Sequence, residues 1–171
     1  MNSSNKKIKI SIDLMGGDNS PNKTLEGIDL FVKRYKHAND YFFYLFGDEQ
    51  VVMPKIKNLK NLKSNYELID TKIVVSNELS PIAALKKGKG SSMWESIQSQ
   101  NLKDSDVTLS AGNTGVFLVM SRMILKMLDG IDRPALAGLW PRDNGMNLVL
   151  DLGANVECSE KNLIDFSEMG A

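Results

Sequence analysis

Apolar and polar residues alternate at the start of the chain. From residue 8 to residue 14, isoleucine or leucine occupies every second position, and this period of two predicts a strand with one apolar face. A glycine-rich turn follows at residues 15–19. Ser20 and Pro21 then suit the cap and the first position of a helix, whose apolar residues keep helical spacing as far as Tyr35. The chain is therefore predicted to open with a strand, a turn and a helix.

The alternation of strands and helices continues along the chain. Residues 41–46 are almost all apolar, as in a strand that is buried on both faces. Residues 107–110 predict a strand that leads into an apolar helix at 116–128, with Gly130 as its cap. Further strands are expected at 66–69, 73–75, 135–139 and 147–151, and further helices at 51–62, 79–85, 92–102 and from 160 onward.

This order of elements predicts the fold class. Strands that alternate with helices form right-handed β-α-β units, so we expect an α/β protein with a mostly parallel sheet covered on both faces, a Rossmann-like three-layer α/β/α sandwich. Residues 1–171 are expected to form a single α/β unit. The helical pattern that starts near residue 160 is still running at Ala171, which indicates an interrupted element.

Composition and charge narrow the functions that this unit can have. With 42% hydrophobic and 25% charged residues, the 171-residue chain is typical of a globular protein. Its 21 basic and 21 acidic residues cancel, so no overall field attracts nucleic acid or anionic lipid. No apolar run reaches the roughly 20 residues of a membrane span. We therefore expect a cytoplasmic protein with no nucleic-acid partner.

The single cysteine and the single histidine exclude several chemistries. Cys158 cannot form an internal disulfide, and one histidine with one cysteine cannot build a zinc-type cluster, so no metal is expected. A catalytic triad would need His37, which lies in a lysine-rich stretch and is interpreted as a solvated helix residue. Cys158 has no base near it in the sequence, so a small buried side chain is favoured over a nucleophile.

Four loops of small residues directly follow predicted strands, at 15–19, 47–49, 110–115 and 151–155. In a parallel sheet all four lie at the carboxyl edge, where doubly wound folds bind ligands. Glycine beside aspartate or asparagine is also ordinary turn chemistry, so each loop alone has a purely structural explanation. Together the four loops predict a pocket lined mainly by backbone.

The loop at 110–115 is the most informative of the four. It leads into a helix, so its backbone N–H groups and the positive end of the helix dipole suit an oxyanion. The chain has neither the Gly-Lys-Ser/Thr of a P-loop nor a Gly-x-Gly-x-x-Gly motif. A nucleoside triphosphate and a dinucleotide are therefore disfavoured.

A basic, glycine-rich loop is expected at residues 86–92. Its three lysines and the Ser91 hydroxyl would suit a phosphate or an acidic partner, whereas the alternative is a solvated surface loop. Ser92 and Glu95 have the spacing of a capping box, so Ser92 is expected to cap the next helix rather than bind a ligand.

Six short motifs follow one another along the chain, at residues 12–18, 46–48, 90–93, 110–115, 130–136 and 150–155. In this order they resemble the bacterial phosphate acyltransferases of phospholipid synthesis, and the last three are specific to that family. The resemblance implies a fold akin to phosphotransacetylases and isopropylmalate dehydrogenases. It also implies transfer of a long-chain acyl group from acyl carrier protein to inorganic phosphate, which gives an acyl phosphate without a cofactor.

Members of that family are about twice as long as this 171-residue chain. The resemblance therefore implies that residues 1–171 are the N-terminal part of a domain about twice as long. The remainder is implied to complete the sheet and to supply a homodimer interface and much of the carrier-protein surface. It is also implied to provide a peripheral contact with the inner face of the membrane and coupling to a glycerol-3-phosphate acyltransferase.

The implied reaction asks little of side chains. Phosphate is already an anionic nucleophile at neutral pH, and the leaving thiol has a pKa of about 8.5, so neither a strong base nor an acyl-enzyme is needed. It is enough to position the phosphate and to donate hydrogen bonds to the oxyanion, and each good donor contributes about 3–4 kcal/mol. The expected catalytic residues are Asn113, Thr114 and Lys87, and the expected phosphate- and substrate-binding residues are Gly16, Gly17, Asp18, Ser91, Gly112, Gly115 and Asn155.

Three alternatives remain open at this point. A phosphotransacetylase would use a coenzyme A thioester in place of acyl carrier protein. A decarboxylating dehydrogenase of the same fold would need a metal and a dinucleotide, for which the sequence carries no signal. A truncated chain without activity would act only as a binding or assembly module.

Overall fold

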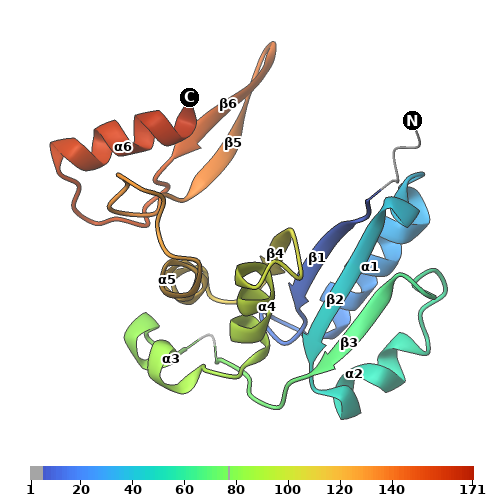
Figure 1. The fold of residues 1–171 in the computed structure, drawn as a ribbon. Helices are drawn as coiled ribbons and strands as arrows, with labels where there is room; N and C mark the ends of the chain where they lie inside the picture. The colour runs from blue at the N-terminus through green and yellow to red at the C-terminus, as the bar shows by residue number, and fades with distance from the viewer. Residues whose placement is uncertain (1–5, 77) are drawn as a thin grey trace. The chain divides into compact units, whose positions relative to one another are not determined.

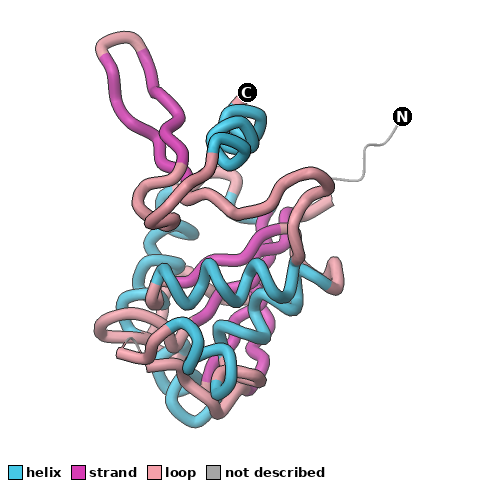
Figure 2. The backbone as a smooth tube through the Cα atoms, turned by 90° about the vertical axis from the view of Figure 1, so that its left-hand side faces the viewer, coloured by secondary structure: helices cyan, strands magenta, loops and turns pink. Residues whose placement is uncertain are grey.

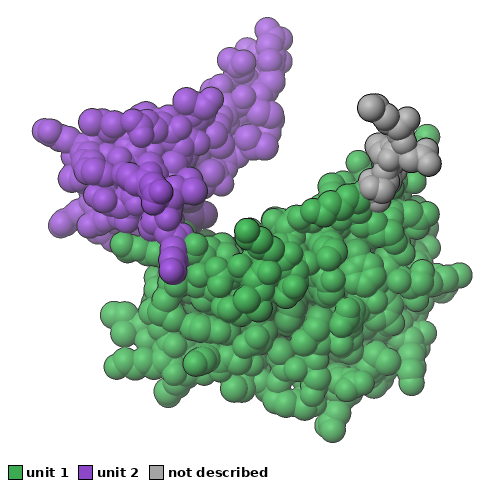
Figure 3. All heavy atoms as spheres, in the orientation of Figure 1, with its two compact units in different colours: residues 1–125 green, residues 126–171 purple. Residues whose placement is uncertain are grey.

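The computed structural model describes residues 6–76 and 78–171, and the chain divides into two compact units. Unit 1 spans residues 1–125 and unit 2 spans residues 126–171 (Figure 3). Each unit has its own sheet (Figure 1). We describe the two units separately.

Unit 1 is built on a sheet of four parallel strands in the order β3-β2-β1-β4. Ile12 pairs with Leu45 on one side and with Leu109 on the other, so β1 is an interior strand and β4 lies at the edge. This arrangement confirms the α/β, Rossmann-like expectation. The strands are β1 (Ile8–Asp13), β2 (Tyr41–Gly47), β3 (Tyr66–Asp70) and β4 (Val107–Ser110).

The two faces of the sheet are covered by different helices (Figures 1 and 2). On one face, Ile12 and Leu14 pack with Leu25 of α1 (Asn22–Arg34) and Val52 of α2 (Glu49–Ile56) in an apolar core. Successive side chains of a strand point to opposite faces. The other face of β1 therefore presents polar side chains, and α4 (Ser92–Asn101) covers it.

A second apolar cluster joins three helices on the α4 side of the sheet. Ala84 of α3 (Pro81–Lys87), Ile97 of α4 and Val116 and Met120 of α5 (Thr114–Leu125) are all fully buried in it. The N-terminal end of α5 is thus fixed by packing against α3 and α4. Both neighbours begin at a serine that accepts a backbone N–H through its side chain.

Several predicted boundaries in unit 1 are wrong. The helix expected at 51–62 begins at Glu49, since Asp48 accepts the Gln50 N–H, and ends at Ile56. Ser20 does not cap α1; its hydroxyl donates to the Met15 carbonyl at 2.8 Å. The expected strand at 73–75 is a single bridge between Ile73 and Ser91.

The end of α5 also differs from the prediction. The helix stops at Leu125, and Lys126 takes a left-handed conformation with φ of 66°. Gly130, the expected cap, lies farther along the chain in a turn of unit 2. His37 precedes a short 3-10 helix, η1 (Ala38–Asp40), and is exposed beyond the end of α1 rather than within a helix.

Unit 2 is an antiparallel hairpin and a helix. Within the described residues, the strands β5 (Ala137–Arg142) and β6 (Gly145–Leu150) pair with each other and with no other strand. The helix α6 (Glu160–Gly170) begins with a capping box from Ser159. The strands expected at 135–139 and 147–151 are present in shifted form, but they do not belong to the parallel sheet. The loop at 151–155 therefore does not follow a strand of that sheet.

Asp29 ties α1 to the segment after α2. Its carboxylate accepts the backbone N–H groups of Asn61 at 2.8 Å and Leu62 at 2.9 Å and the Asn61 side-chain amide at 2.8 Å. Partial burial works to raise the pKa of Asp29, but these hydrogen bonds outweigh it and hold the pKa below its usual value. A lowered pKa in the folded state contributes stability above the unfolded pKa, and this stability is lost as pH falls through the folded pKa.

We predict that Asp29→Ala lowers the free energy of unfolding at pH 7 by roughly 1–3 kcal/mol, because it removes hydrogen bonds to a charged group. Urea denaturation followed by circular dichroism measures this loss. The exposed Glu26 on the same helix provides the control, and Glu26→Ala should change stability by less than about 0.5 kcal/mol. The difference between wild type and Asp29→Ala should shrink below about pH 4. A difference that is constant with pH would contradict this assignment.

Candidate functional site

The loops after β1 and β4 meet at the carboxyl edge of the sheet. From β1 the chain continues to β2 on one side, whereas β4 lies on the other side, so the strand order reverses between β1 and β4. Open α/β sheets bind ligands in the crevice at such a switch point. The loops predicted at 15–19 and 110–115 both lie there, and Gly47 of the third loop packs beside Met15. The loop at 151–155 belongs to unit 2.

Asp13, the last residue of β1, joins the two loops. Its side chain is 1% exposed and accepts four hydrogen bonds. One oxygen accepts the Met15 and Gly16 N–H groups at 3.1 Å each and the Ser92 hydroxyl at 2.6 Å. The other oxygen accepts the Ser110 hydroxyl at 2.7 Å. A buried carboxylate is tolerated only when it is hydrogen-bonded in this way.

The hydrogen bonds extend from Asp13 into the loop after β4. The Ser110 hydroxyl, which donates to Asp13, also accepts the Gly112 N–H at 3.0 Å. Ser110 and Asp13 are paired residues of neighbouring strands, so the contact follows from the register of the sheet. The conformation of the 111–113 segment is therefore held by β1 as well as by β4.

Two glycines allow the loops to approach each other. A Cβ at Gly16 would overlap the Asp13 carboxylate and lie 3.0 Å from the Gly112 nitrogen. Gly17 has φ of +91°, and a Cβ there would lie 2.5 Å from the Ala111 carbonyl oxygen. Only glycine meets both demands of space and backbone conformation. The two predicted binding glycines thus shape the site through the space that they leave.

A pocket of about 370 Å³ opens where the two loops meet, at the N-terminus of α5. Asn113 caps this helix, because its side-chain oxygen accepts the Val116 N–H at 3.1 Å. The first N–H groups of a helix have no partner within it and point toward its N-terminal end. The pocket is lined by Gly17, Asp18, Ala111, Gly112, Asn113, Thr114 and Gly115. All but Ala111 are residues that the sequence predicted for the site.

Among the described residues that line this pocket, none is a lysine or an arginine. Its one charged side chain is that of Asp18, which is exposed. An anion would therefore be held by backbone N–H groups and the helix dipole instead of by a basic side chain. Phosphate-sized anions are bound at helix N-termini on this principle, and Asp18 opposes them electrostatically.

Lys87 is not among the residues that line the pocket. It is the last residue of α3, so Lys86 and Lys87 belong to a helix and not to the loop that we expected. Pro81, at the start of α3, lies beside Gly115, whereas Gly88, just after its end, packs against Met120. Gly115 and Met120 are five residues apart on α5, about 7.5 Å along the helix axis. The end of α3 that carries Lys87 therefore lies beside a later part of α5 than the pocket residue Gly115. The role of Lys87 stays a prediction.

Ser91 and Ser92 have exchanged the roles that the sequence predicted. Ser91 is fully buried and caps α4 by accepting the Trp94 N–H at 3.2 Å. Ser92 is the first residue of the helix, and its hydroxyl donates to Asp13. The expected cap thus reaches the centre of the site, and the expected phosphate donor is occupied as a cap.

The two remaining candidates lie in unit 2. Asn155 holds a loop of that unit by donating to the Pro134 carbonyl at 3.1 Å and to Asp151 at 2.8 Å. Cys158 is exposed, not buried as expected. Desolvation and a hydrogen bond to Asp151 raise the pKa of its thiol, which disfavours the nucleophilic thiolate.

Sequence reasoning missed Asp13 and the polar layer next to it. Ser11 and Asp13 occupy the polar positions of the alternating strand, yet both are buried beneath α4. Ser11 donates to the Ser96 carbonyl at 2.8 Å and shares a hydrogen bond with Thr108. The available signal was the spacing of Ser92, Ser96 and Ser99, which places three small polar residues on one face of a helix.

Comparisons with known proteins identify the family of the chain. The family model described as "Fatty acid synthesis protein" matches residues 8–171. The chain belongs to this family. A phosphate acyltransferase from Pelagibacter ubique is 50% identical over 166 residues, which cover 97% of this chain and 48% of the relative. Another from Rhodospirillum rubrum is 42% identical over 161 residues, 94% of this chain and 45% of the relative.

The comparisons confirm the resemblance to phosphate acyltransferases that the motifs predicted. A third protein of that name, from Paramagnetospirillum magneticum, is 38% identical over 163 residues, 95% of this chain and 46% of the relative. The chain spans about half the length of the curated relatives that it matches. Among the residues that the structure describes, none of the helices has the length and apolar character needed to cross a membrane.

We predict that Gly16→Ala destabilises the protein by about 1–3 kcal/mol, because the new methyl group displaces either the Asp13 carboxylate or the Gly112 backbone. The midpoint and slope of urea unfolding measure the loss. Gly27→Ala is the matched control, since a Cβ at that helical position meets nothing within 4 Å and should stabilise by about 0.5–1 kcal/mol. Equal effects of the two substitutions would contradict the close approach of the loops.

Proposed function

We propose that this protein is a phosphate acyltransferase that forms an acyl phosphate from an acyl thioester and inorganic phosphate. The observation that carries the proposal is the backbone-lined pocket at the switch point of the sheet. It has the form of an oxyanion site, and it occurs in a chain whose relatives are named phosphate acyltransferases. The whole family member, of which this chain spans about half, would carry out the reaction.

Phosphate is the ligand that we assign to this pocket. The N–H groups at the start of α5 would donate to its oxygens, with Asn113, Thr114 and Gly115 nearest and Gly17 and Gly112 completing the wall. Asp18 would orient the loop after β1 from the rim of the pocket. Gly16 and Asp13 are positioning residues, because they fix the two loops and do not line the pocket themselves.

The reaction needs no covalent intermediate with the protein. A phosphate oxygen attacks the thioester carbon, the carbonyl oxygen takes up negative charge, and the collapse of the tetrahedral intermediate breaks the carbon–sulfur bond. The sulfur leaves as a thiolate and takes a proton from water. The protein holds phosphate in position and donates hydrogen bonds to the developing charge, which are the two contributions that this site can make.

Acyl carrier protein is the donor that we propose, with a coenzyme A thioester as the competing donor. Acyl phosphate formation, followed by trapping with hydroxylamine, distinguishes the two when acyl carrier protein and coenzyme A thioesters of the same acyl chain are compared. The donor, a homodimeric state, a cytoplasmic location and a peripheral membrane contact remain predictions from the resemblance.

Thr114→Pro tests the backbone donors directly. Proline is tolerated at the first position of a helix, where it removes the N–H group and leaves the helix intact. We expect phosphate binding, measured by calorimetry or ³¹P NMR titration, to weaken about tenfold to a hundredfold, since a hydrogen bond to a charged group is lost.

Thr114→Ala is the matched control for this substitution, because it keeps the N–H and removes only the side chain. It should bind phosphate within about threefold of wild type if the backbone supplies the contact. Lys87→Ala is measured in the same phosphate-binding assay, because Lys87 is still a predicted donor to the phosphate. Unchanged affinity in Thr114→Pro would show that phosphate does not bind in this pocket.

Asp18→Asn should strengthen phosphate binding, because it removes the negative charge from the pocket lining. We expect an increase of about threefold or more at low salt, which shrinks as added salt screens the charge. Asp40→Asn removes the same charge from a residue directly before β2, at the amino ends of the strands and away from the pocket. It should leave the affinity unchanged. Equal effects of the two substitutions would show that the phosphate is not held beside Asp18.

A further inference from the structure

The proposed phosphate pocket combines hydrogen-bond donors with one charged acceptor. Thr114 and Gly115 contribute the backbone N–H groups at the start of α5, which have no partner within the helix. Among the described residues that line the pocket, Asp18 carries the one charged side chain. An ionised carboxylate only accepts hydrogen bonds, whereas an N–H group only donates them. A bound oxyanion would therefore meet both kinds of partner.

The loop that carries Asp18 is held from both ends. Just before Asp18, Gly17 lies so close to the loop after β4 that a Cβ would be 2.5 Å from the Ala111 carbonyl oxygen. Just after it, the Ser20 hydroxyl donates to the Met15 carbonyl at 2.8 Å and closes the loop. The backbone thus fixes Asp18 in the lining of the pocket.

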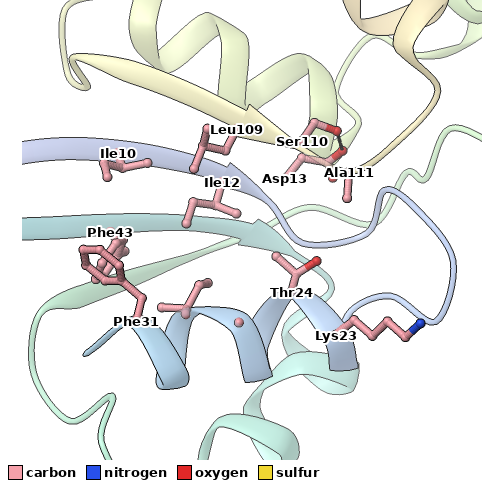
Figure 4. Close-up of a pocket in the computed structure, with 12 residues that line it drawn as sticks. Ile10, Ile12, Asp13, Lys23, Thr24, Phe31, Phe43, Leu109, Ser110 and Ala111 are labelled. Atoms are coloured by element: carbon pink, nitrogen blue, oxygen red, sulfur yellow. Dashed lines mark hydrogen bonds between the residues drawn. The ribbon is translucent and has the colours of Figure 1, made fainter. Parts of the chain in front are cut away.

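The charge of Asp18 is not neutralised within the part of the chain that the structure describes. No residue in 6–76 or 78–171 supplies its carboxylate with an ion pair or a hydrogen bond. Lys23 is the nearest lysine along the chain, but it lines a different cavity, between α1 and the strands β1 and β4 (Figure 4). The Asp18 carboxylate can therefore accept a hydrogen bond from a ligand.

Phosphate and sulfate are both tetrahedral oxyanions, and they differ in their protons. Near neutral pH phosphate keeps at least one proton, so one of its oxygens donates a hydrogen bond. Sulfate keeps none, so all of its oxygens only accept. Next to an ionised carboxylate, a phosphate hydroxyl makes a charge-assisted hydrogen bond. A sulfate oxygen in the same place sets two acceptors and two negative charges against each other, which penalises binding.

We propose that Asp18 makes this pocket selective for phosphate over sulfate, by accepting a hydrogen bond from the phosphate hydroxyl while the N–H groups of α5 donate to the other oxygens. This inference rests on the proposed function and names the residue that determines which oxyanion the site accepts. The negative charge of Asp18 lowers the affinity for every anion. The hydrogen bond offsets this loss only for an anion that carries a proton.

Titration of the 171-residue chain with phosphate, arsenate and sulfate, followed by calorimetry, tests the proposal. The wild type should bind phosphate at least about tenfold more tightly than sulfate. Arsenate is larger than sulfate but keeps a proton, so it should bind within about threefold of phosphate. At about pH 8.5 phosphate and sulfate are both dianions, and the preference should persist there because phosphate still carries a proton. A preference that disappears at this pH would overturn the proposal.

Asp18→Asn changes what the residue offers to each anion. The asparagine oxygen still accepts a hydrogen bond from phosphate, and its amide adds a donor for sulfate. Sulfate binding should therefore strengthen about tenfold more than phosphate binding does, and most of the preference should be lost. Asp40→Asn, the control away from the pocket, should keep the preference of the wild type. A preference that Asp18→Asn leaves unchanged would overturn the proposal.

Thr114→Pro distinguishes a failure of this inference from a failure of the proposed function. The N–H group that it removes donates to any oxyanion, so phosphate, arsenate and sulfate should all bind more weakly, with their ratios within about twofold of wild type. Weaker binding in Thr114→Pro together with an unchanged preference in Asp18→Asn would keep phosphate in the pocket and overturn the role of Asp18. Unchanged binding in Thr114→Pro would overturn both.

Discussion

The Asp13 carboxylate holds together three elements that are far apart in the sequence. It accepts hydrogen bonds from its own following loop, from Ser92 at the start of α4 and from Ser110 at the end of β4. A buried carboxylate without these donors would cost several kcal/mol, so the donors and the acceptor stabilise the arrangement only as a set. The position of the loop at 111–115 depends on this interaction, and the shape of the anion pocket follows from it.

The polar layer around Asp13 explains why α4 lies where it does. The face of β1 toward α4 carries Ser11 and Asp13, so an apolar helix would leave their hydrogen bonds unmade. Instead α4 presents Ser92 and the Ser96 carbonyl, and Ser105 donates to Ser11 at 3.1 Å. The opposite face of the same strand is wholly apolar and packs on α1 and α2. One face of the sheet therefore packs through apolar side chains, whereas the other face makes the hydrogen bonds that position α4 and the loops at the carboxyl edge.

Sequence patterns predicted the elements that local periodicity determines. The strands β1, β2 and β4 agree within about one residue with the alternating and apolar runs that predicted them. The start of α4 differs because a tertiary contact decides between two adjacent serines: Ser92 turns to Asp13, so Ser91 becomes the cap. The burial of Asp13 follows from a helix that arrives 79 residues later in the chain, and the alternation of the strand carries no trace of it.

The short connection between the two strands of unit 2 indicates that they are antiparallel. The expected strands at 135–139 and 147–151 leave seven residues between them, whereas a parallel connection needs about a dozen or more. The structure joins β5 and β6 through Asp143 and Asn144 only, with Gly145 at φ of 137°. Connection length thus predicts the strand direction that apolar pattern alone does not.

The cavity beside β1 and β4 and the pocket at the start of α5 have different linings because of where each lies on the fold. Along β1 and β4 the pleat turns side chains outward, so a cavity beside the strands is lined by Ile10, Ile12 and Leu109. Past Ser110 the chain leaves the sheet and its backbone N–H groups lose their ladder partners, so a cavity there is lined by small residues and suits an anion. Ala111 lies at this transition.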